Sequence, residues 1–325
     1  EGGKWSHDAD NRQQWRGDPP APVPLRFEVD PITAEVVDLV ERRFGDHPGR
    51  ISPEQIPARL EDVEAVWNWT MQHCMTHFGP FEDAMTSKSV QLFHGRLSGL
   101  MNLHRLLPAR VVEDVLTMEI PINSKEGFVR QVVGWREFVR HVHRETDGFR
   151  DVPEELAGAV RRNEPPLDAS RPLPPVFWTG KSGLGCLDHV VSEVWSEGYS
   201  HHINRLMVLA NWATLLGIDA EAVSDWFWVA FEDAYDWVVE PNVLGMGTYA
   251  VGDLMVTKPY VSGSAYVNKM SDYCKSCSFD PKSTCPMTSL YWNFLSTNES
   301  VLSGNPRMRI VMSALRKRDP ERRAR

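Results

Sequence analysis

Three of the five cysteines of this 325-residue chain lie within one short stretch near its C-terminal end. Two residues separate Cys274 from Cys277, and seven more separate Cys277 from Cys285. Thiols at the first spacing can bind one metal ion or one edge of a cluster. A four-ligand site needs one more sulfur, and the sequence offers only Cys74 and Cys186. The stretch therefore predicts a thiolate site that a distant segment must close, which constrains the fold of the whole chain.

The composition is typical of a globular protein, since 42% of the residues are hydrophobic and 24% are charged. No run of about 18 apolar residues occurs, so no membrane-spanning helix is expected. We find no signal peptide and therefore expect the protein in the cytoplasm. The odd number of cysteines and their clustering argue against a disulfide framework. The chain begins without an initiator methionine, and we expect it to be the C-terminal part of a longer protein.

The charge distribution leaves two interpretations open. The net charge of −9 by itself disfavours a nucleic-acid partner. The last twenty residues are instead basic and could bind phosphates, or they could form a solvated tail. The eight basic residues concerned are Arg307, Arg309, Arg316, Lys317, Arg318, Arg322, Arg323 and Arg325.

Apolar residues recur at helical spacing along most of the chain, whereas the alternation typical of strands is nearly absent. Asp30 and Pro31 predict the cap and the first position of a helix that Gly45 ends. Residues 1–29 are proline-rich and predict an extended arm, and the chain after Pro241 is predicted to be irregular. The fold class is therefore mainly α. Helices are predicted at residues 31–43, 53–76, 89–105, 108–117, 124–145, 186–197, 199–216, 219–238 and 286–296.

Two segments have side chains suited to a cofactor. Residues 93–99 lie at a predicted helix start, where free backbone N–H groups can bind a diphosphate, although an ordinary capped helix is the simpler explanation. Residues 131–140 place aromatic, amide and charged side chains on helix faces that could line a flat ligand. An amphipathic helix with an internal ion pair would have the same pattern.

His201, His202 and Arg205 lie together in an apolar segment that is predicted to be helical. A histidine is usually structural, but an imidazole in a water-poor pocket can donate a proton near neutral pH. A buried Arg205 needs a carboxylate, which Asp233 or Asp236 on the next predicted helix can supply. Most of the twelve tryptophans are expected to fill the core, yet aromatic side chains beside a redox cofactor can also carry electrons.

Together these motifs resemble the iron–sulfur bacterial cryptochromes and photolyases, also described as prokaryotic (6-4) photolyases or deoxyribodipyrimidine photolyase-related proteins. The resemblance extends over essentially the whole chain in order. The segments that carry it are Gly2-Gly3-Lys4-Trp5, Asp8-Ala9-Asp10-Asn11-Arg12, Arg96-Leu97-Ser98, Gly134-Trp135-Arg136-Glu137-Phe138-Val139-Arg140, Phe177-Trp178-Thr179-Gly180, His201-His202-Ile203-Asn204-Arg205-Leu206-Met207, Pro241-Asn242-Val243-Leu244-Gly245-Met246, and Thr257-Lys258-Pro259-Tyr260 through Met270-Ser271-Asp272-Tyr273-Cys274 to Trp292.

The resemblance implies a photolyase-type FAD-binding helical catalytic domain at residues 30–240. An extended arm or interdomain segment at residues 1–29 would precede it, and a C-terminal iron–sulfur region with a basic tail would follow at residues 241–325. The family's N-terminal α/β antenna domain is expected to be absent from this chain. An antenna pigment is therefore not expected.

The resemblance also implies roles for individual residues. A [4Fe–4S] cluster would be held by Cys186, Cys274, Cys277 and Cys285, which leaves Cys74 as a core residue. His202 would be the catalytic proton donor, with His201 beside it. Electrons would reach the flavin over Trp226, Tyr266, Trp178 and Tyr260. The FAD-binding residues would be His94, Arg96, Leu97, Ser98, Gln131, Trp135, Arg136, Phe138, Arg205 and Asp233.

The implied function is the light-driven repair of (6-4) pyrimidine photoproducts in DNA by electron transfer from reduced FAD. The enzyme would be a monomeric lyase that binds UV-damaged DNA, associates with the nucleoid when bound and does not bind membranes, with Mg²⁺ as a further candidate cofactor for activity. A blue-light photoreceptor of the cryptochrome type and a cluster-stabilised DNA-binding module without photochemistry are the alternatives. The adjacent histidines disfavour the repair of cyclobutane dimers.

Overall fold

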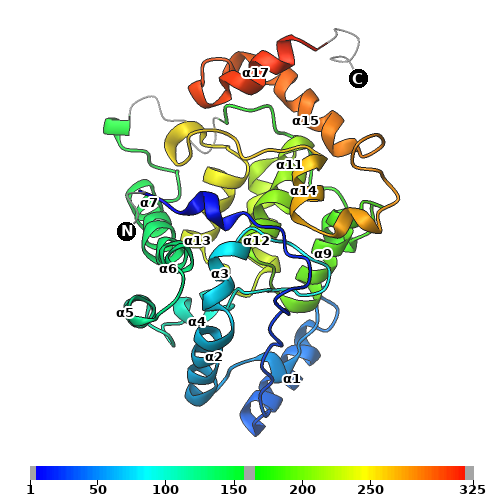
Figure 1. Cartoon of the computed structure of the whole chain (residues 1–325). Helices are drawn as coiled ribbons and strands as arrows, with labels where there is room; N and C mark the ends of the chain where they lie inside the picture. The colour runs from blue at the N-terminus through cyan, green and yellow to red at the C-terminus, as the bar shows by residue number, and fades with distance from the viewer. Residues whose placement is uncertain (1–4, 157–164, 319–325) are drawn as a thin grey trace. The chain divides into compact units, whose positions relative to one another are not determined.

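The computed structural model describes residues 5–156 and 165–318, which form helices joined by loops (Figure 1). No strand occurs in these two ranges, where Arg171 and Ile218 pair in an isolated β-bridge. The predicted mainly α fold class is confirmed. None of the helices in the same ranges combines the length and the apolar composition needed to cross a bilayer.

The chain divides into two compact units, each assembled from segments far apart in the sequence. The first unit consists of Glu1–Trp135, Ser192–His201 and Ala230–Asp233. The second consists of Arg136–Val191, His202–Val229 and Ala234–Arg325. The domain boundaries predicted after residues 29 and 240 describe another division of the chain and stay predictions.

The helices of the first unit enclose an apolar core. Trp67, Phe78 and Phe128 are buried in it, and each comes from a different helix. Burial of large aromatic side chains is a major favourable contribution to folding. Helices α3 and α6 lie side by side (Figure 1). The elements are η1 (Asp8–Asn11), α1 (Pro31–Phe44), η2 (Pro53–Gln55), α2 (Leu60–His73), α3 (Met75–Phe81), α4 (Ser98–Asn102), α5 (Pro108–Thr117) and α6 (Ile122–Val129).

Local capping chemistry sets the starts of α1 and α2. The Asp30 carboxylate accepts hydrogen bonds of 2.9 Å from the backbone N–H groups of Ile32 and Thr33, so the predicted start of α1 is confirmed. The predicted start of α2 at residue 53 is wrong. Ile56 is extended because a proline follows it, and the helix begins only at Leu60.

The second unit has more and shorter helices, and α11 packs against α15. Helix α9 begins in this unit, and its last residues belong to the first. The elements are α7 (Glu137–Thr146), η4 (Glu154–Leu156), α8 (Val176–Thr179), α9 (Gly185–Glu197), α10 (His202–Asn204), α11 (Asn211–Leu215), α12 (Ala220–Ala230), α13 (Asp236–Glu240), η7 (Gly252–Leu254), α14 (Ser264–Met270), η8 (Tyr273–Lys275), α15 (Pro286–Thr297), α16 (Glu299–Leu302), η9 (Pro306–Met308) and α17 (Arg309–Arg316).

Three π-helical segments coincide with motifs that the sequence singles out. They are η3 (Arg130–Arg136), η5 (Arg205–Ala210) and η6 (Pro241–Gly247). The wide π turn is uncommon and occurs frequently at functional sites. These three segments therefore support a functional role for the motifs that contain them.

Several predicted helix bounds are wrong. The helix predicted at residues 89–105 is limited to α4, because Leu92 and Arg96 have left-handed φ angles of +45° and +51°, which a right-handed helix cannot contain. The helix predicted at residues 219–238 is interrupted after Ala230, so Asp233 lies between α12 and α13. The chain after Pro241 is more helical than predicted, since it contains η6 and α14. The basic residues beyond Arg318 lie outside the described ranges, as do Gly2, Gly3 and Lys4.

Candidate functional site

Four cysteines of the second unit converge from segments that are distant in the sequence. Cys186 is the second residue of α9, and Cys274 lies in η8. Cys285 immediately precedes α15. The backbone N–H of Gly185 donates a hydrogen bond of 3.4 Å to Sγ of Cys277, which joins the start of α9 to the C-terminal cysteine stretch. The structure therefore brings together the sulfurs that the sequence predicts as ligands.

Two N–H groups point at these sulfurs. Besides the bond from Gly185, Nε1 of the buried Trp212 donates a hydrogen bond of 3.5 Å to Sγ of Cys186. A Cβ at Gly185 would lie 3.2 Å from Cβ of Cys277, so the start of α9 packs tightly against the cysteine stretch. Hydrogen bonds to cysteine sulfurs are a recurrent feature of iron–sulfur sites, where they tune the reduction potential.

The thiols themselves are electrostatically unfavourable as anions without a bound cation. Burial raises the pKa of Cys186 to about 12 and that of Cys274 to about 11, and the neighbouring cysteines add to both shifts. Burial also raises the pKa of Cys285. A bound metal ion or cluster supplies the positive charge that favours the thiolate forms.

The four cysteines also influence one another electrostatically, since Cys274 and Cys285 contribute to the raised pKa of Cys186. Four thiolates can hold either a single zinc ion or an iron–sulfur cluster. Cys74 belongs to another environment, since it is fully buried in an apolar cluster of the first unit with Phe81 and Phe93.

In the first unit, α4 holds the segment that contains Asp233. Oγ of Ser98, the first residue of α4, donates a hydrogen bond of 2.5 Å to Oδ2 of Asp233. Nδ2 of Asn102 donates one of 3.0 Å to the backbone oxygen of the same residue. Asp233 is buried. Two predicted cofactor residues, Ser98 and Asp233, are therefore in direct contact.

Arg96 makes ion pairs with two carboxylates within the first unit. Its guanidinium donates to the side chain of Glu197 at 3.2 Å, to the Glu197 backbone oxygen at 3.0 Å and to Glu232 at 3.2 Å, and it stacks over Tyr199. Burial alone would lower the pKa of Arg96, but Glu232, Tyr199 and Glu197 outweigh that effect and raise it. The guanidinium that the sequence assigns to a diphosphate thus already pairs with two carboxylates.

The two histidines His94 and His201 stack in the first unit, with ring centroids 4.8 Å apart and an angle of 8° between the planes. Nδ1 of His94 lies 2.8 Å from the backbone oxygen of Gln91, which places the proton of a neutral His94 on Nδ1. His202 is the first residue of α10 and is half-buried. Leu97 is a buried core residue, as its apolar side chain requires.

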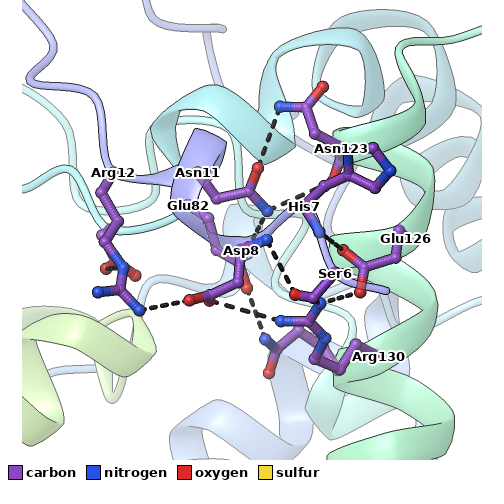
Figure 2. Close-up of polar contacts among 11 residues, drawn as sticks. Ser6, His7, Asp8, Asn11, Arg12, Glu82, Asn123, Glu126 and Arg130 are labelled. Atoms are coloured by element: carbon purple, nitrogen blue, oxygen red, sulfur yellow. Dashed lines mark hydrogen bonds and ion pairs between the residues drawn. The ribbon is translucent and has the colours of Figure 1, made fainter. Parts of the chain in front are cut away.

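Gln131 is held through a buried network that begins in the N-terminal arm. Its Nε2 donates a hydrogen bond of 2.5 Å to Oε1 of Glu82. Nδ2 of Asn11 donates one of 2.8 Å to Oε2 of the same carboxylate (Figure 2). Asn11 in turn exchanges hydrogen bonds with Asn123, at 3.3 and 3.0 Å (Figure 2). Asn11 and Glu82 are functional candidates that the sequence analysis missed.

Around the end of η3, the predicted cofactor residues differ in exposure. Arg136 pairs with Glu137 at 2.5 Å and lies 5.0 Å from the ring of Trp237. Burial lowers the pKa of Arg136. Its Nε is buried and has no hydrogen-bond partner in the described ranges. Trp135 is half-buried, and Phe138 is exposed.

The predicted electron carriers are spread over the second unit. Trp226 is buried and donates a hydrogen bond of 3.0 Å to the backbone oxygen of Phe177. The Trp226 and Phe177 rings pack edge to face, with centroids 5.2 Å apart. Trp178 and Tyr260 are exposed. Tyr266 is half-buried on α14. The predicted carriers thus range from the buried Trp226 through the half-buried Tyr266 to the exposed Trp178 and Tyr260.

The N-terminal arm is part of the first unit rather than a free extension. Its backbone donates hydrogen bonds from Gln13 to Pro80 at 3.0 Å and from Phe27 to Glu54 at 2.8 Å. Residues 21–26 of the arm also form one wall of a half-open groove of about 370 Å³, which Arg96 lines as well. The sequence predicts an extended arm but gives no indication of this groove.

Comparison with known proteins gives one extensive match and two partial ones. Residues 1–56 match the family described as deoxyribodipyrimidine photo-lyase-related protein. A (6-4) photolyase of Agrobacterium fabrum (strain C58 / ATCC 33970) is 37% identical over 316 residues, covering 94% of this chain and 60% of that protein. The uncharacterized protein R855 of Acanthamoeba polyphaga mimivirus is 38% identical over 98 residues, covering 30% of this chain and 76% of that protein.

Among solved structures, that of a bacterial class III photolyase from Agrobacterium tumefaciens matches with a TM-score of 0.44 and 18% identity. The match covers 64% of this chain and 41% of that one. The present chain thus spans about three fifths of the length of the (6-4) photolyase that it matches.

Proposed function

We propose that the chain belongs to the deoxyribodipyrimidine photolyase-related family and is the catalytic portion of a (6-4) photolyase. The observation that carries the proposal is the 37% identity to a protein named (6-4) photolyase over nearly the whole of this chain. The substrate would be DNA that contains (6-4) pyrimidine photoproducts. The proposed organisation is the predicted one, with an arm at residues 1–29, a catalytic domain at 30–240 and an iron–sulfur region at 241–325.

FAD is the proposed cofactor of the catalytic domain. When bound, it would supply light absorption and one-electron transfer, chemistry that no side chain offers. The buried Nε–H of Arg136, which lacks an acceptor in the described ranges, fits a ligand with phosphate or carbonyl oxygens. Ser98 and Asp233 would hold the cofactor as a pair, since they already hydrogen-bond each other. The other proposed contacts are His94, Arg96, Leu97, Gln131, Trp135, Phe138 and Arg205.

The proton chemistry would fall to His202. Protonation of the lesion needs a group that gives up a proton near neutral pH, and an imidazole does so. His201, stacked on His94, would fix the backbone position from which His202 projects. Flipping the lesion out of the duplex costs a few kcal/mol and least for a damaged base, which favours the lesion over intact DNA.

Cys186, Cys274, Cys277 and Cys285 would hold a [4Fe–4S] cluster. The donor set consists of four thiols with two N–H groups directed at their sulfurs. Because the ligands join the start of α9 to the segment before α15, the cluster would fasten the C-terminal region to the rest of the second unit. Its proposed role is structural.

The remaining predictions belong to the same proposal. Trp226, Tyr266, Trp178 and Tyr260 would relay electrons, and basic residues such as Arg309 on α17 would contact DNA phosphates in a salt-dependent manner. A monomeric state, a cytoplasmic location with the DNA and a Mg²⁺ requirement stay predictions. Chelation with EDTA during the repair assay tests the last of these.

The decisive experiment is a repair assay on an oligonucleotide with one (6-4) photoproduct, in blue light and in the dark. The protein is first reduced under anaerobic conditions, and its flavin and iron are measured. Light-dependent loss of the lesion supports the proposal, and His202→Ala should abolish repair while FAD stays bound. A flavin-loaded protein that repairs nothing in light would instead point to a photoreceptor. Protein without flavin would point to a DNA-binding module.

A further inference from the structure

Glu82 is a buried carboxylate whose two oxygens are occupied by side-chain amides. Oε2 accepts from Asn11 at 2.8 Å, and Oε1 accepts from Gln131 at 2.5 Å. The exposed fractions of Asn11 and Glu82 are 2% and 6%. The carboxylate therefore makes its hydrogen bonds in a place where water is largely excluded, and each of these bonds has a fixed polarity.

The donor and the acceptor of each hydrogen bond can be assigned from Asn11 in the arm to Gln131. Nδ2 of Asn11 also donates to the backbone oxygen of Asn123 at 3.3 Å, and a carbonyl can only accept. Oδ1 of Asn11 accepts from Nδ2 of Asn123 at 3.0 Å, which agrees with the same orientation (Figure 2). A carboxylate likewise only accepts, so the amide of Gln131 must turn its NH₂ group toward Glu82. Its carbonyl oxygen Oε1 must then face away from Glu82.

From this geometry we infer that Glu82 is a positioning residue that makes Gln131 present a hydrogen-bond acceptor to the cofactor. The inference rests on the proposed function, in which Gln131 contacts FAD. In the described ranges, the bond to Glu82 is the only hydrogen bond of the Gln131 side chain. An acceptor at this place selects a donor on the ligand, which in FAD is the adenine amino group, the N–H of the isoalloxazine or a ribose hydroxyl.

The backbone of α6 leaves room for this arrangement. A Cβ on Gly127 would lie 2.7 Å from Nδ2 of Asn11 and 2.9 Å from Oε2 of Glu82, closer than ordinary packing allows. The network therefore lies directly against a glycine of α6, one helical turn before Gln131. Such close packing leaves the Glu82 side chain little freedom to give up either amide.

The substitution Glu82→Gln tests the inference because it changes polarity without changing shape. Oε1 of the new glutamine would still accept from Asn11, and its NH₂ group would face Gln131. Gln131 would then turn its oxygen inward and its NH₂ group outward. Every hydrogen bond of the network is kept, but the face presented to the cofactor becomes a donor.

The double variant Glu82→Gln with Gln131→Glu restores the original face. The new glutamine would donate to one oxygen of the new carboxylate, and the other oxygen would again be an outward acceptor. Glu113→Gln is the control for loss of one negative charge, since Glu113 is exposed on α5 and no hydrogen bond or ion pair of it occurs in the described ranges.

The first readout is the dissociation constant of added FAD, measured by flavin fluorescence on full-length apoprotein. Glu82→Gln should weaken FAD binding by roughly ten- to hundredfold, because the NH₂ group of Gln131 would then face a hydrogen-bond donor of FAD. The double variant should recover most of that loss, and Glu113→Gln should match the wild type. Unchanged affinity in Glu82→Gln, or no recovery in the double variant, would overturn the inference.

The second readout needs no cofactor. In ¹⁵N-labelled protein, the side-chain NH₂ signals of Gln131, assigned by their loss in Gln131→Glu, should be protected from solvent exchange. In Glu82→Gln they should exchange at least about tenfold faster, because the group then faces outward. Equal exchange in both proteins would refute the turned amide. A wild type that shows the protected NH₂ group but binds no FAD would refute the proposed function instead.

Discussion

Ser98 donates a 2.5 Å hydrogen bond to Asp233, 135 residues further along the chain. A serine that the sequence assigns to a diphosphate is thus already bonded to a buried acid. Ser98→Ala should lower the free energy of unfolding by about 1.5–3 kcal/mol, because it removes a donor from a buried carboxylate. Asn102→Ala should cost about 1 kcal/mol, since its acceptor is a neutral backbone carbonyl. Urea denaturation of both variants checks this order, and equal losses would contradict it.

Replacement of Cys186 should affect iron far more than replacement of Cys74. Cys186→Ala removes one of four converging thiols, so most of the bound iron should be lost, and stability should fall by several kcal/mol because metal binding is coupled to folding. Cys74→Ala is the matched control in an apolar core and should cost roughly 1 kcal/mol with iron retained. Iron and sulfide analysis with thermal unfolding measures both effects. A soluble Cys186→Ala protein with full iron content would remove Cys186 from the ligand set.

Trp212 and Trp67 are two buried tryptophans with different partners. Nε1 of Trp212 donates to Sγ of Cys186, whereas Nε1 of Trp67 donates to Asp114 at 2.7 Å. Either substitution to phenylalanine should destabilise its unit by about 1–3 kcal/mol through lost packing and a lost hydrogen bond. Only Trp212→Phe should also lower the reduction potential of the proposed cluster, because an N–H bond to sulfur stabilises the reduced form. A redox titration followed by electron paramagnetic resonance distinguishes them, and equal potentials would contradict the role of Trp212.

The contact between Arg59 and Asp62 at the start of α2 should make the melting temperature depend on pH. Asp62 accepts from the backbone N–H, Nε and Nη2 of Arg59 at 3.0, 3.2 and 3.0 Å, and the Arg59 side chain is the main cause that holds the pKa of Asp62 below its usual 3.8. An acid whose pKa is lower in the folded than in the unfolded state stabilises the fold at pH values above its unfolded-state pKa. This contribution is lost as the pH falls through the folded-state pKa. Arg59→Met should therefore lower the melting temperature at pH 7 by a few degrees, and the difference should shrink progressively as the pH falls below 3.8.

Arg26→Met is the control for this comparison. Arg26 pairs with Glu54 at the surface, where an ion pair contributes roughly 0–1 kcal/mol. Its melting curve should follow that of the wild type at every pH. An Arg59→Met difference that does not shrink as the pH is lowered far below 3.8 would show that the effect comes from packing and not from the charge of Asp62.

What the sequence predicts well in this chain depends on near neighbours. Asp30 caps α1 because its own backbone turns the carboxylate onto the next N–H groups, and the spacing of Cys274 and Cys277 already indicates a shared site. The family resemblance supplies what spacing cannot, namely the choice of Cys186. The structure places that residue as expected, at the start of α9.

What the sequence does not predict depends on distant contacts. Nothing near Glu82 indicates that it will meet Asn11, 71 residues earlier, and Gln131, 49 residues later. The ion pairs of Arg96 span 101 and 136 residues. Its left-handed backbone, like that of Leu92, carries none of the glycine or asparagine signals by which such turns are recognised. Tertiary packing outweighs local preference at both positions, and the predicted helix therefore begins too early.

The convergence of Cys186 with Cys274, 88 residues further on, also imposes an order on biosynthesis. At about 5–20 residues per second, the ribosome would release Cys186 roughly 4–18 s before the next ligand emerges. In that interval α9 carries a lone thiol, exposed to oxidation and to mispairing. On the proposed cluster assignment, delivery of iron would follow translation of the C-terminal segment, and the nascent chain would be a stage at which oxidants can attack the unprotected ligand.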